Sequence, residues 1–221
     1  MRKLIGKIYR RALPRGAQAR LDCLRARPSW RSQQASFVHV PKAAGFSVSN
    51  ALYGKALGHI RAETIKRYSP REFDQCFKFA FVRHPVTRYI SALSYVRENY
   101  QALHGSPGLP PEHLLPLGPL EFFDEWLADI DLADTNFVFQ PQADFIFDRH
   151  DTLLVDYLAR FEDFDGEIEH LARRLPRLAT IQRLNASGSA AVSYPFEQLD
   201  ARLRQVYARD YRLLGYQGTP A

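Results

Sequence analysis

Cysteine is scarce in this 221-residue sequence, which contains only Cys23 and Cys76. No CxxC pair and no cluster of cysteine with histidine occurs, so the sequence supports neither a disulfide framework nor a structural zinc site. It also contains no apolar run of 18 or more residues and no apolar signal near its start, so it predicts no membrane-spanning helix and no secretion signal. Two isolated thiols are compatible with a reducing cytoplasm.

Acidic residues are fewer than basic ones. The chain holds 30 Lys and Arg against 24 Asp and Glu, for a formal net charge of +6. This excess favours an acidic ligand, such as a nucleotide, a sulfated or uronic polysaccharide, nucleic acid or a membrane surface, and charge alone does not choose among them. The 46% hydrophobic and 24% charged content is typical of a globular protein, and the length suits one domain with a full core.

Residues 37–47, FVHVPKAAGFS, contain the first candidate site. The β-branched and aromatic run at their start predicts a buried strand, which Pro41 ends. Lys42 follows among small side chains that let backbone N–H groups approach a ligand, and Ser47 opens the next helical stretch. These features predict a phosphate-binding turn, although a strand-to-helix turn with a solvated lysine is the alternative. It is not a Walker A loop, because Lys42 precedes Gly45.

A second strand and turn follow in residues 77–91, FKFAFVRHPVTRYIS. The apolar run predicts a strand that ends at Arg83, and Pro85 suits the first position of a helix. That helix carries Arg88 and Ser91. Two strand ends that bind anions, separated by one helical segment, suit a nucleotide with phosphates at both ends of its ribose.

Together the two segments resemble the 5′-phosphosulfate and 3′-phosphate motifs of sulfotransferases that use 3′-phosphoadenosine 5′-phosphosulfate (PAPS). The similarity is to the carbohydrate branch that includes heparan sulfate 2-O-sulfotransferase, in sulfotransferase family 2. Shorter similar pieces follow in order, namely FQPQADFI, LVDYLARFEDF, LNAS and RDYRLLGY, so the resemblance extends over residues 36–216. It implies an enzyme that moves a sulfuryl group from PAPS to a hydroxyl of a saccharide or glycoconjugate acceptor, with no nucleic acid partner.

The resemblance also implies roles for individual residues. Lys42 is the catalytic cation at the oxygen between phosphate and sulfate, where negative charge grows in the transition state, and no metal is required. Arg83 and Ser91 bind the 3′-phosphate, and Arg88 assists them. The residues assigned to the 5′ end of the donor are Pro41, Lys42, Ala43, Ala44, Gly45, Phe46 and Ser47.

Two further assignments depend on the resemblance. In the similar 2-O-sulfotransferases, a histidine between the two motifs is proposed as the base that removes the acceptor's hydroxyl proton, and His59 matches it by position. An ordinary surface histidine is the alternative. Asn185 and Ser187 belong to a loop that covers the nucleotide in those enzymes, although a mobile connector explains the same small residues. His84 and Phe46 differ from the residues usual in the family, which limits any transfer of acceptor specificity.

Apolar periodicity predicts an α/β domain, and the resemblance implies a central parallel sheet flanked by helices, as in the P-loop-NTPase-like sulfotransferase fold. The expected strands are residues 37–40, 77–82 and 153–155. The expected helices are residues 48–53, 85–100, 120–130 and 162–175, with a long terminal helix from residue 196. We expect a polar link at residues 58–73 and an acceptor-binding lid at residues 101–119, where five prolines and three glycines occur.

Residues 1–30 are expected to form a basic leader before a sulfotransferase domain at residues 31–221. The leader holds nine Lys and Arg but one acid, with apolar residues loosely on one face. Such a segment can lie on an anionic membrane or bind an acidic partner, and a solvated, partly helical leader is the alternative. We expect a cytoplasmic enzyme of the bacterial type, with no transmembrane anchor and with peripheral membrane contact through this segment.

The residues alone leave two other functions open. A nucleotide kinase or another P-loop phosphotransferase would share the strand, turn and helix, but the sequence lacks GxxxxGK[ST] and offers only Asp156 as a magnesium ligand after an apolar run. A non-enzymatic polyanion-binding module would use the net charge of +6. Such a module would not need Lys42 among small residues, and salt would abolish its binding.

Overall fold

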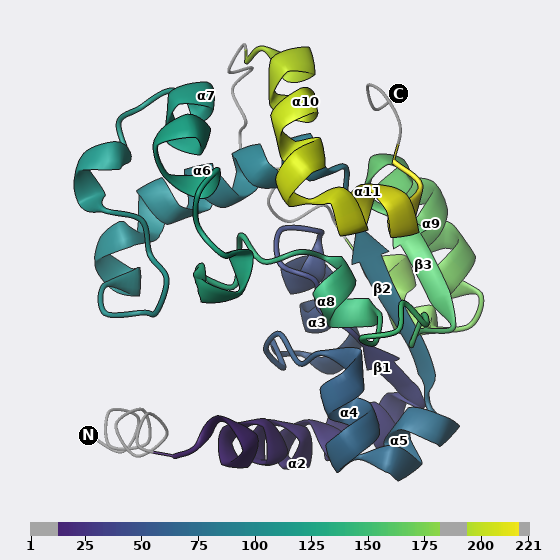
Figure 1. Ribbon diagram of the computed structural model, residues 1–221. Helices are drawn as coiled ribbons and strands as arrows, with labels where there is room; N and C mark the ends of the chain where they lie inside the picture. The colour runs from purple at the N-terminus through teal and green to yellow at the C-terminus, as the bar shows by residue number, and fades with distance from the viewer. Residues whose placement is uncertain (1–12, 182–193, 217–221) are drawn as a thin grey trace.

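A computed structural model describes residues 13–181 and 194–216 of the chain, which form a parallel sheet flanked by helices (Figure 1). The sheet has three strands in the order β1-β2-β3, and both neighbouring pairs are parallel. The strands are β1 (Ala35–Phe37), β2 (Phe77–Val82) and β3 (Tyr157–Arg160). This architecture confirms the expected α/β class.

β2 follows its apolar run in the sequence, whereas β1 lies earlier than the run that predicted it. β2 has the bounds that the sequence predicts, and all of it beyond its first residue is buried, as expected for a parallel strand covered on both faces. β1 begins at Ala35 and ends at Phe37, so it shares only Phe37 with the strand predicted at residues 37–40. The chain beyond it stays buried, and Val38 donates its N–H to the carbonyl oxygen of Phe79 at 2.9 Å. Pro41 then begins a turn.

The prediction of a strand at residues 153–155 is wrong. β3 begins at Tyr157, which pairs with Phe79 of β2. Leu153 forms only an isolated antiparallel bridge with Phe147, and the two apolar residues that follow it are buried outside any strand. An apolar run indicates that a segment is buried, and irregular segments can be buried as well as strands. The sequence pattern therefore could not show where β3 begins.

Ten α-helices lie within the described residues. Their bounds are α2 (Arg15–Gln33), α3 (Gly45–Tyr53), α4 (Ala62–Tyr68), α5 (Pro70–Gln75), α6 (Pro85–Leu103), α7 (Pro119–Phe122), α8 (Ala143–Ile146), α9 (Phe164–Ala172), α10 (Phe196–Val206) and α11 (Ala208–Leu214). The helices predicted after the first two strands are confirmed as α3 and α6, and Pro85 is the first residue of α6. None of the described helices combines the length and apolar character needed to cross a bilayer.

Other helices differ from prediction. The expected polar link contains α4 and α5. The expected terminal helix is two helices, because Tyr207 leaves the helical conformation between α10 and α11. Its side chain is buried, and its hydroxyl donates a hydrogen bond to the carbonyl oxygen of Phe139. Residues 119–127 combine α7 with a π-helical turn, Phe123–Leu127.

Residue 30, the expected end of the leader, lies inside α2. One face of this helix is buried, with Cys23, Ala26 and Trp30 each at most 2% exposed. Glu72 of α5, which is buried, accepts a hydrogen bond of 2.6 Å from Nε of Arg31. The helix therefore packs into the domain well before residue 31, and this ion pair holds α2 and α5 together.

Candidate functional site

The turn after the first strand holds two non-glycine residues in the left-handed region, Lys42 at φ 64° and Ala44 at φ 62°. Such a conformation costs free energy and concentrates at functional sites. Ala44 is also the N-cap of α3, and its methyl group cannot accept a hydrogen bond from the first turn. A turn of this kind before a helix N-terminus presents backbone N–H groups to an anion, as the sequence predicts for residues 41–47.

Gly45 begins α3 directly against the imidazole of His39. A Cβ atom at residue 45 would lie 1.7 Å from Cδ2 and 1.8 Å from Nε2 of His39, which is 9% exposed. Those distances are far below van der Waals contact, so only glycine fits here without displacement of the histidine. Sequence reasoning assigned Gly45 to ligand approach and missed this packing role.

Lys42 lies half-buried in the turn, with Nζ 4.4 Å from the centre of the Tyr95 ring on α6. Burial lowers the pKa of this ammonium, and the positive charge of Arg83 lowers it further, while Glu98 opposes both. The two predicted cations are therefore within electrostatic reach of each other. Within residues 13–181 and 194–216, neither forms an ion pair with a carboxylate.

Arg83 follows the last residue of β2 and is held at both backbone groups. Its N–H donates to Oε1 of Gln142 at 2.9 Å, and Nε2 of Gln142 donates to its carbonyl oxygen at 2.8 Å. The guanidinium donates from Nε to Oγ1 of Thr87 at 3.0 Å and stacks on Phe161, 4.3 Å from the ring centre. This arrangement orients the planar fork, whose terminal nitrogens suit a phosphate.

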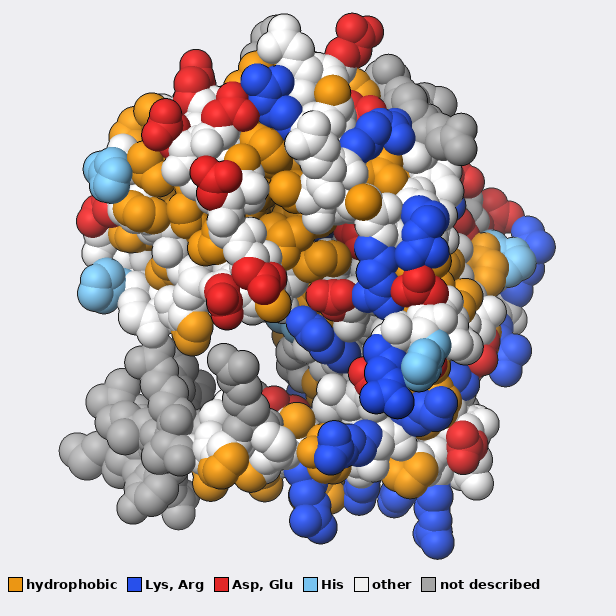
Figure 2. Space-filling view, in the orientation of Figure 1, with side chains coloured by type: hydrophobic (Ala, Val, Ile, Leu, Met, Phe, Trp, Pro, Cys, Tyr) orange, Lys and Arg blue, Asp and Glu red, His pale blue; other side chains and the backbone are white. Residues whose placement is uncertain are grey.

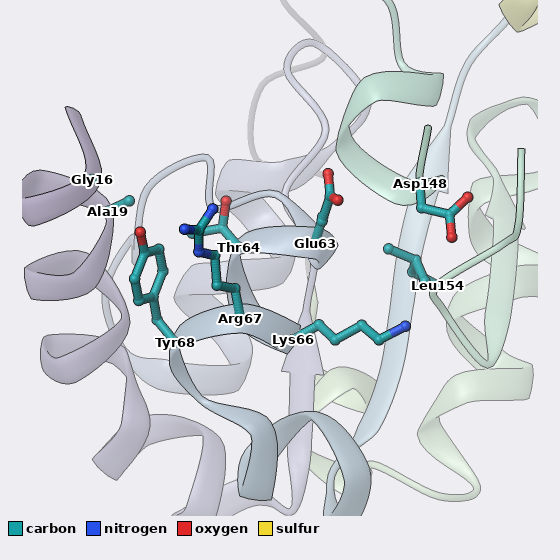
Figure 3. Close-up of a pocket in the computed structure, with 9 residues that line it drawn as sticks. All are labelled: Gly16, Ala19, Glu63, Thr64, Lys66, Arg67, Tyr68, Asp148 and Leu154. Carbon is teal, nitrogen blue, oxygen red and sulfur yellow. The ribbon is translucent and has the colours of Figure 1, made fainter. Parts of the chain in front are cut away.

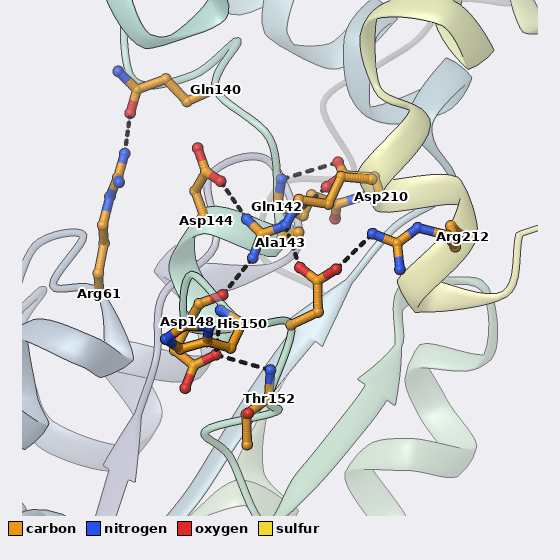
Figure 4. Close-up of polar contacts among 12 residues, drawn as sticks. Arg61, Gln140, Gln142, Ala143, Asp144, Asp148, His150, Thr152, Asp210 and Arg212 are labelled. Atoms are coloured by element: carbon orange, nitrogen blue, oxygen red, sulfur yellow. Dashed lines mark hydrogen bonds and ion pairs between the residues drawn. The ribbon is translucent and has the colours of Figure 1, made fainter.

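Gln142 is itself fixed from α11. Its backbone N–H and that of Ala143 donate to the carboxylate of Asp210 at 2.9 and 2.8 Å (Figure 4). Both Gln142 and Asp210 are fully buried. Burial raises the pKa of Asp210, and the charge of Arg88 and the two amides oppose that rise. A chain of hydrogen bonds thus runs from α11 through Gln142 to Arg83, and it gives the FQPQADFI segment a positioning role that periodicity did not predict.

One side of α6 joins the two cations. Thr87, Ser91, Tyr95 and Glu98 are spaced four, four and three residues apart, which places them along one face of a helix. Thr87 bonds Arg83 at one end, and Tyr95 lies under Lys42 towards the other. Ser91, which is half-buried, lies between them on this face. Sequence reasoning found Ser91 and missed Thr87 and Tyr95, although both are one turn from it.

His59 lies beside the turn. Its Nδ1 is 3.0 Å from the carbonyl oxygen of His39, and its ring centre is 4.0 Å from that of His39 and 4.6 Å from that of Phe137. Burial lowers the pKa of His59, and the charge of Lys42 adds to this, while the hydrogen bond to His39 opposes it. A carbonyl oxygen only accepts, so Nδ1 carries the proton and the neutral ring keeps a lone pair on Nε2.

Arg88 packs into the core beside the C-terminal helices, and its positive charge adds to burial in lowering the pKa of Arg83. The side chain of Arg88 is fully buried, Nη1 donates to the carbonyl oxygen of Val138 at 3.0 Å, and the guanidinium lies 5.1 Å from the centre of the Tyr207 ring. Together with its effect on Asp210, these contacts place Arg88 in the core between α6 and the C-terminal helices. Asn185 and Ser187 lie outside the described residues.

Asp156, the alternative magnesium ligand, lies at the end of the sheet where the strands begin, opposite the turn at Lys42. It precedes β3, where its Oδ2 accepts from the N–H and from Nζ of Lys78 at 2.8 and 3.0 Å. In a parallel sheet all strands start at one end of the sheet and finish at the other, so the start of one strand is far from the end of its neighbour. The turn at Lys42 follows the end of β1, so Asp156 cannot act there.

A shallow hollow between α2 and α4, drawn in Figure 3, is separate from this site. Its lining residues are Gly16, Ala19, Glu63, Thr64, Lys66, Arg67, Tyr68, Asp148 and Leu154. None of the predicted donor-binding residues is among them. The turn, the two cations, the α6 face and His59 therefore form the candidate site.

Comparisons with protein-family models, with curated proteins and with solved structures find no match to this chain.

Proposed function

We propose that this protein transfers a sulfuryl group from PAPS to a hydroxyl of a carbohydrate or glycoconjugate acceptor. The observation that carries the proposal is the position of Lys42 and Arg83, two cations at neighbouring strand ends that contact one face of α6 through Tyr95 and Thr87. A donor with anionic groups at both ends of its ribose needs such a pair. The parallel sheet is also consistent with a P-loop-NTPase-like sulfotransferase fold, which we propose as the finer class.

Each group has a proposed role in donor binding. The N–H groups of residues 43–46 and the hydroxyl of Ser47 bind the 5′-phosphate at the start of α3. The guanidinium of Arg83 and the hydroxyl of Ser91 bind the 3′-phosphate. Lys42 leaves the ring of Tyr95 to reach the oxygen that bridges phosphate and sulfate. Burial of this lysine strengthens its attraction to the charge that grows there.

The proposed step exchanges one bond to sulfur for another. The bond between sulfur and the bridging oxygen breaks, and its electron pair stays on the 5′-phosphate, next to Lys42. A bond forms between sulfur and the acceptor oxygen, and the acceptor's proton passes to Nε2 of His59. The products are 3′-phosphoadenosine 5′-phosphate and a sulfated saccharide. The lowered pKa of His59 supports this role, because the ring is neutral at physiological pH and ready to accept a proton.

We also propose a cytoplasmic location, with which the two buried, unpaired cysteines are compatible. The kinase alternative loses support, because Asp156 accepts a hydrogen bond from Lys78 at the other end of the sheet from the turn at Lys42. The polyanion-binding alternative does not explain the left-handed conformation of Lys42 or its position over Tyr95.

Calorimetry with 3′-phosphoadenosine 5′-phosphate tests the proposal. We expect the wild type to bind and the double variant Lys42→Ala, Arg83→Ala to lose binding by at least about a hundredfold, since each cation contributes a charge-assisted contact. Arg173→Ala with Arg202→Ala removes two exposed positive charges elsewhere and should bind like the wild type. No binding by the wild type, or equal loss in both double variants, would defeat the proposal. Tight binding of magnesium-ATP instead would favour a kinase, and equally strong, salt-sensitive binding of any polyanion would favour a binding module.

A further inference from the structure

Helix α2 has apolar side chains on two opposite faces. Cys23, Ala26 and Trp30 face the core. Leu24 faces outward and is 41% exposed, and Leu13, just before the helix, is 37% exposed. The described chain has only four exposed large hydrophobic residues, and two of them lie here. Leu24 on the outer side of α2 and Leu13 before the helix are therefore apolar side chains that the described residues leave partly uncovered.

Exposed cations outnumber exposed acids on α2 and on the two helices that pack with it. Among the side chains described on α2, α4 and α5, six Lys or Arg and only two acids are exposed. The exposed cations are Arg20, Arg25, Arg31, Lys66, Arg67 and Arg71, and the exposed acids are Glu63 and Asp74. Helix α4 packs against α2 and α5, so these side chains lie on one part of the molecule. Figure 2 shows hydrophobic and Lys or Arg side chains together along the lower edge, where Figure 1 places these helices.

We propose that this basic face, formed by Leu13, Leu24 and the six exposed cations, docks on an anionic lipid bilayer. Arg20 precedes Leu24 by one helical turn, so a cation and an apolar side chain project side by side, as in helices that lie in the membrane interface. The cations meet lipid headgroups, and the leucines enter the boundary of the acyl chains. Exposed leucines favour a bilayer over an acidic polymer, which offers nothing apolar to receive them.

The sequence just before the described residues continues this composition. Residues 1–12 contain five Lys and Arg, no acid and the apolar residues Leu4, Ile5 and Ile8. The chain enters the described structure at Leu13, which belongs to the basic face. Cationic and apolar residues therefore continue along the chain up to this surface. The inference uses none of the residues assigned to sulfuryl transfer, so either proposal can fail alone.

Vesicle sedimentation with the full-length protein tests the inference. We expect binding to vesicles that contain about one-third phosphatidylglycerol, weaker binding at high salt and little binding to pure phosphatidylcholine. Arg20→Glu with Arg25→Glu should lower the partition coefficient by at least about tenfold, because each cation near an anionic surface contributes independently. Arg173→Glu with Arg202→Glu changes the net charge equally on other parts of the molecule and should have a much smaller effect.

The variant Leu24→Ser distinguishes binding to a bilayer from binding to an acidic polymer. It should weaken vesicle binding several-fold and leave retention on immobilised heparin unchanged, because only a bilayer receives the leucine. The inference would be overturned if the wild type did not bind anionic vesicles. It would also be overturned if the two charge-reversal double variants weakened binding equally, or if Leu24→Ser bound vesicles as tightly as the wild type. Thermal unfolding and nucleotide calorimetry on each variant show that the fold and the donor site are intact, so the two proposals are judged separately.

Discussion

The imidazole of His39 occupies the space that any side chain at residue 45 would need, since an added Cβ would lie only 1.7 Å from Cδ2. His39 lies two residues beyond the end of β1, and Gly45 is the first residue of α3. Their contact therefore fixes how closely the helix approaches the strand end. It also fixes where the first amides of α3 point, so the proposed binding of the donor phosphate would depend on this packing.

Gly45→Ala should lose both stability and donor binding. The methyl group must displace His39 or move the start of α3, and overpacking of this kind costs typically about 1–3 kcal/mol in unfolding free energy. Affinity for 3′-phosphoadenosine 5′-phosphate should fall at least about tenfold, because the amides no longer converge. Urea unfolding and calorimetry measure the two effects.

Gly54→Ala is the matched control at the other end of α3. Gly54 has φ 70°, and no described atom beyond its chain neighbours lies within 4 Å of an added Cβ. The substitution introduces left-handed strain of roughly 1–2 kcal/mol without a clash near the turn. Stability should fall and nucleotide affinity should not. Normal nucleotide binding by Gly45→Ala would contradict the role we give to this contact.

Stability should fall as pH drops below about 6.5, the ordinary histidine pKa. Burial lowers the pKa of His39 and of His59, and each is lowered further by neighbouring positive charge. Below that pH the unfolded chain takes up protons at both sites before the folded chain does, so acid favours unfolding. Each site contributes at most about 1.4 kcal/mol per pH unit.

Urea unfolding from about pH 5 to about pH 8 checks this dependence. The double variant His39→Gln, His59→Asn should show a flatter profile than the wild type. His104→Asn alters an exposed histidine on the surface loop and should follow the wild type. A double variant with the full wild-type slope would assign the acid sensitivity to other groups.

The variant His59→Asn should slow the proposed proton transfer without a loss of stability. The Asn amide nitrogen stands near the position of Nδ1 and can keep the hydrogen bond to the carbonyl oxygen of His39. Stability near neutral pH and nucleotide affinity should change little. Sulfuryl transfer, followed with labelled PAPS and a true acceptor, should slow about 10²- to 10⁴-fold, the usual contribution of a general base. Full turnover by this variant would remove His59 from the base role and leave the donor site intact.

Much of the fold was predictable where one local signal dominates. The strand at residues 77–82 is an unbroken apolar run, and Pro85 marks the start of α6, so β2 and α6 follow from sequence alone. Pro41 and the small residues after it likewise predicted the turn at the start of α3. Gly54, in the left-handed region, ends that helix as expected.

What could not be predicted depends on contacts between distant segments. The helices α4 and α5 are short and polar. Glu72 accepts from Arg31 and holds α5 to α2, and Arg27 of α2 donates to the carbonyl oxygen of Tyr68 at the end of α4. Likewise, the backbone of Arg83 is fixed by Gln142, 59 residues later in the chain. His39 looked like an ordinary strand residue, because its contacts with Gly45 and His59 appear only after folding. No periodicity encodes such pairs.

The last prediction concerns Arg88 and Asp210, whose opposite charges interact in the core. Each substitution removes one of the two interacting buried charges and the hydrogen bonds that its side chain makes, so Arg88→Met and Asp210→Asn should each lower the unfolding free energy, by about 1–3 kcal/mol. The double variant should lose less than the sum, with a coupling of roughly 0.5–3 kcal/mol.

Nucleotide binding adds a second readout for this pair. Asp210 holds Gln142, which holds Arg83, so Asp210→Asn should weaken nucleotide binding several-fold through that chain. Arg88→Met should retain near-normal affinity, since its side chain is fully buried and bonds Val138. If Arg88→Met instead lost affinity at least about tenfold with unchanged unfolding free energy, Arg88 would be a ligand contact and not only a core residue.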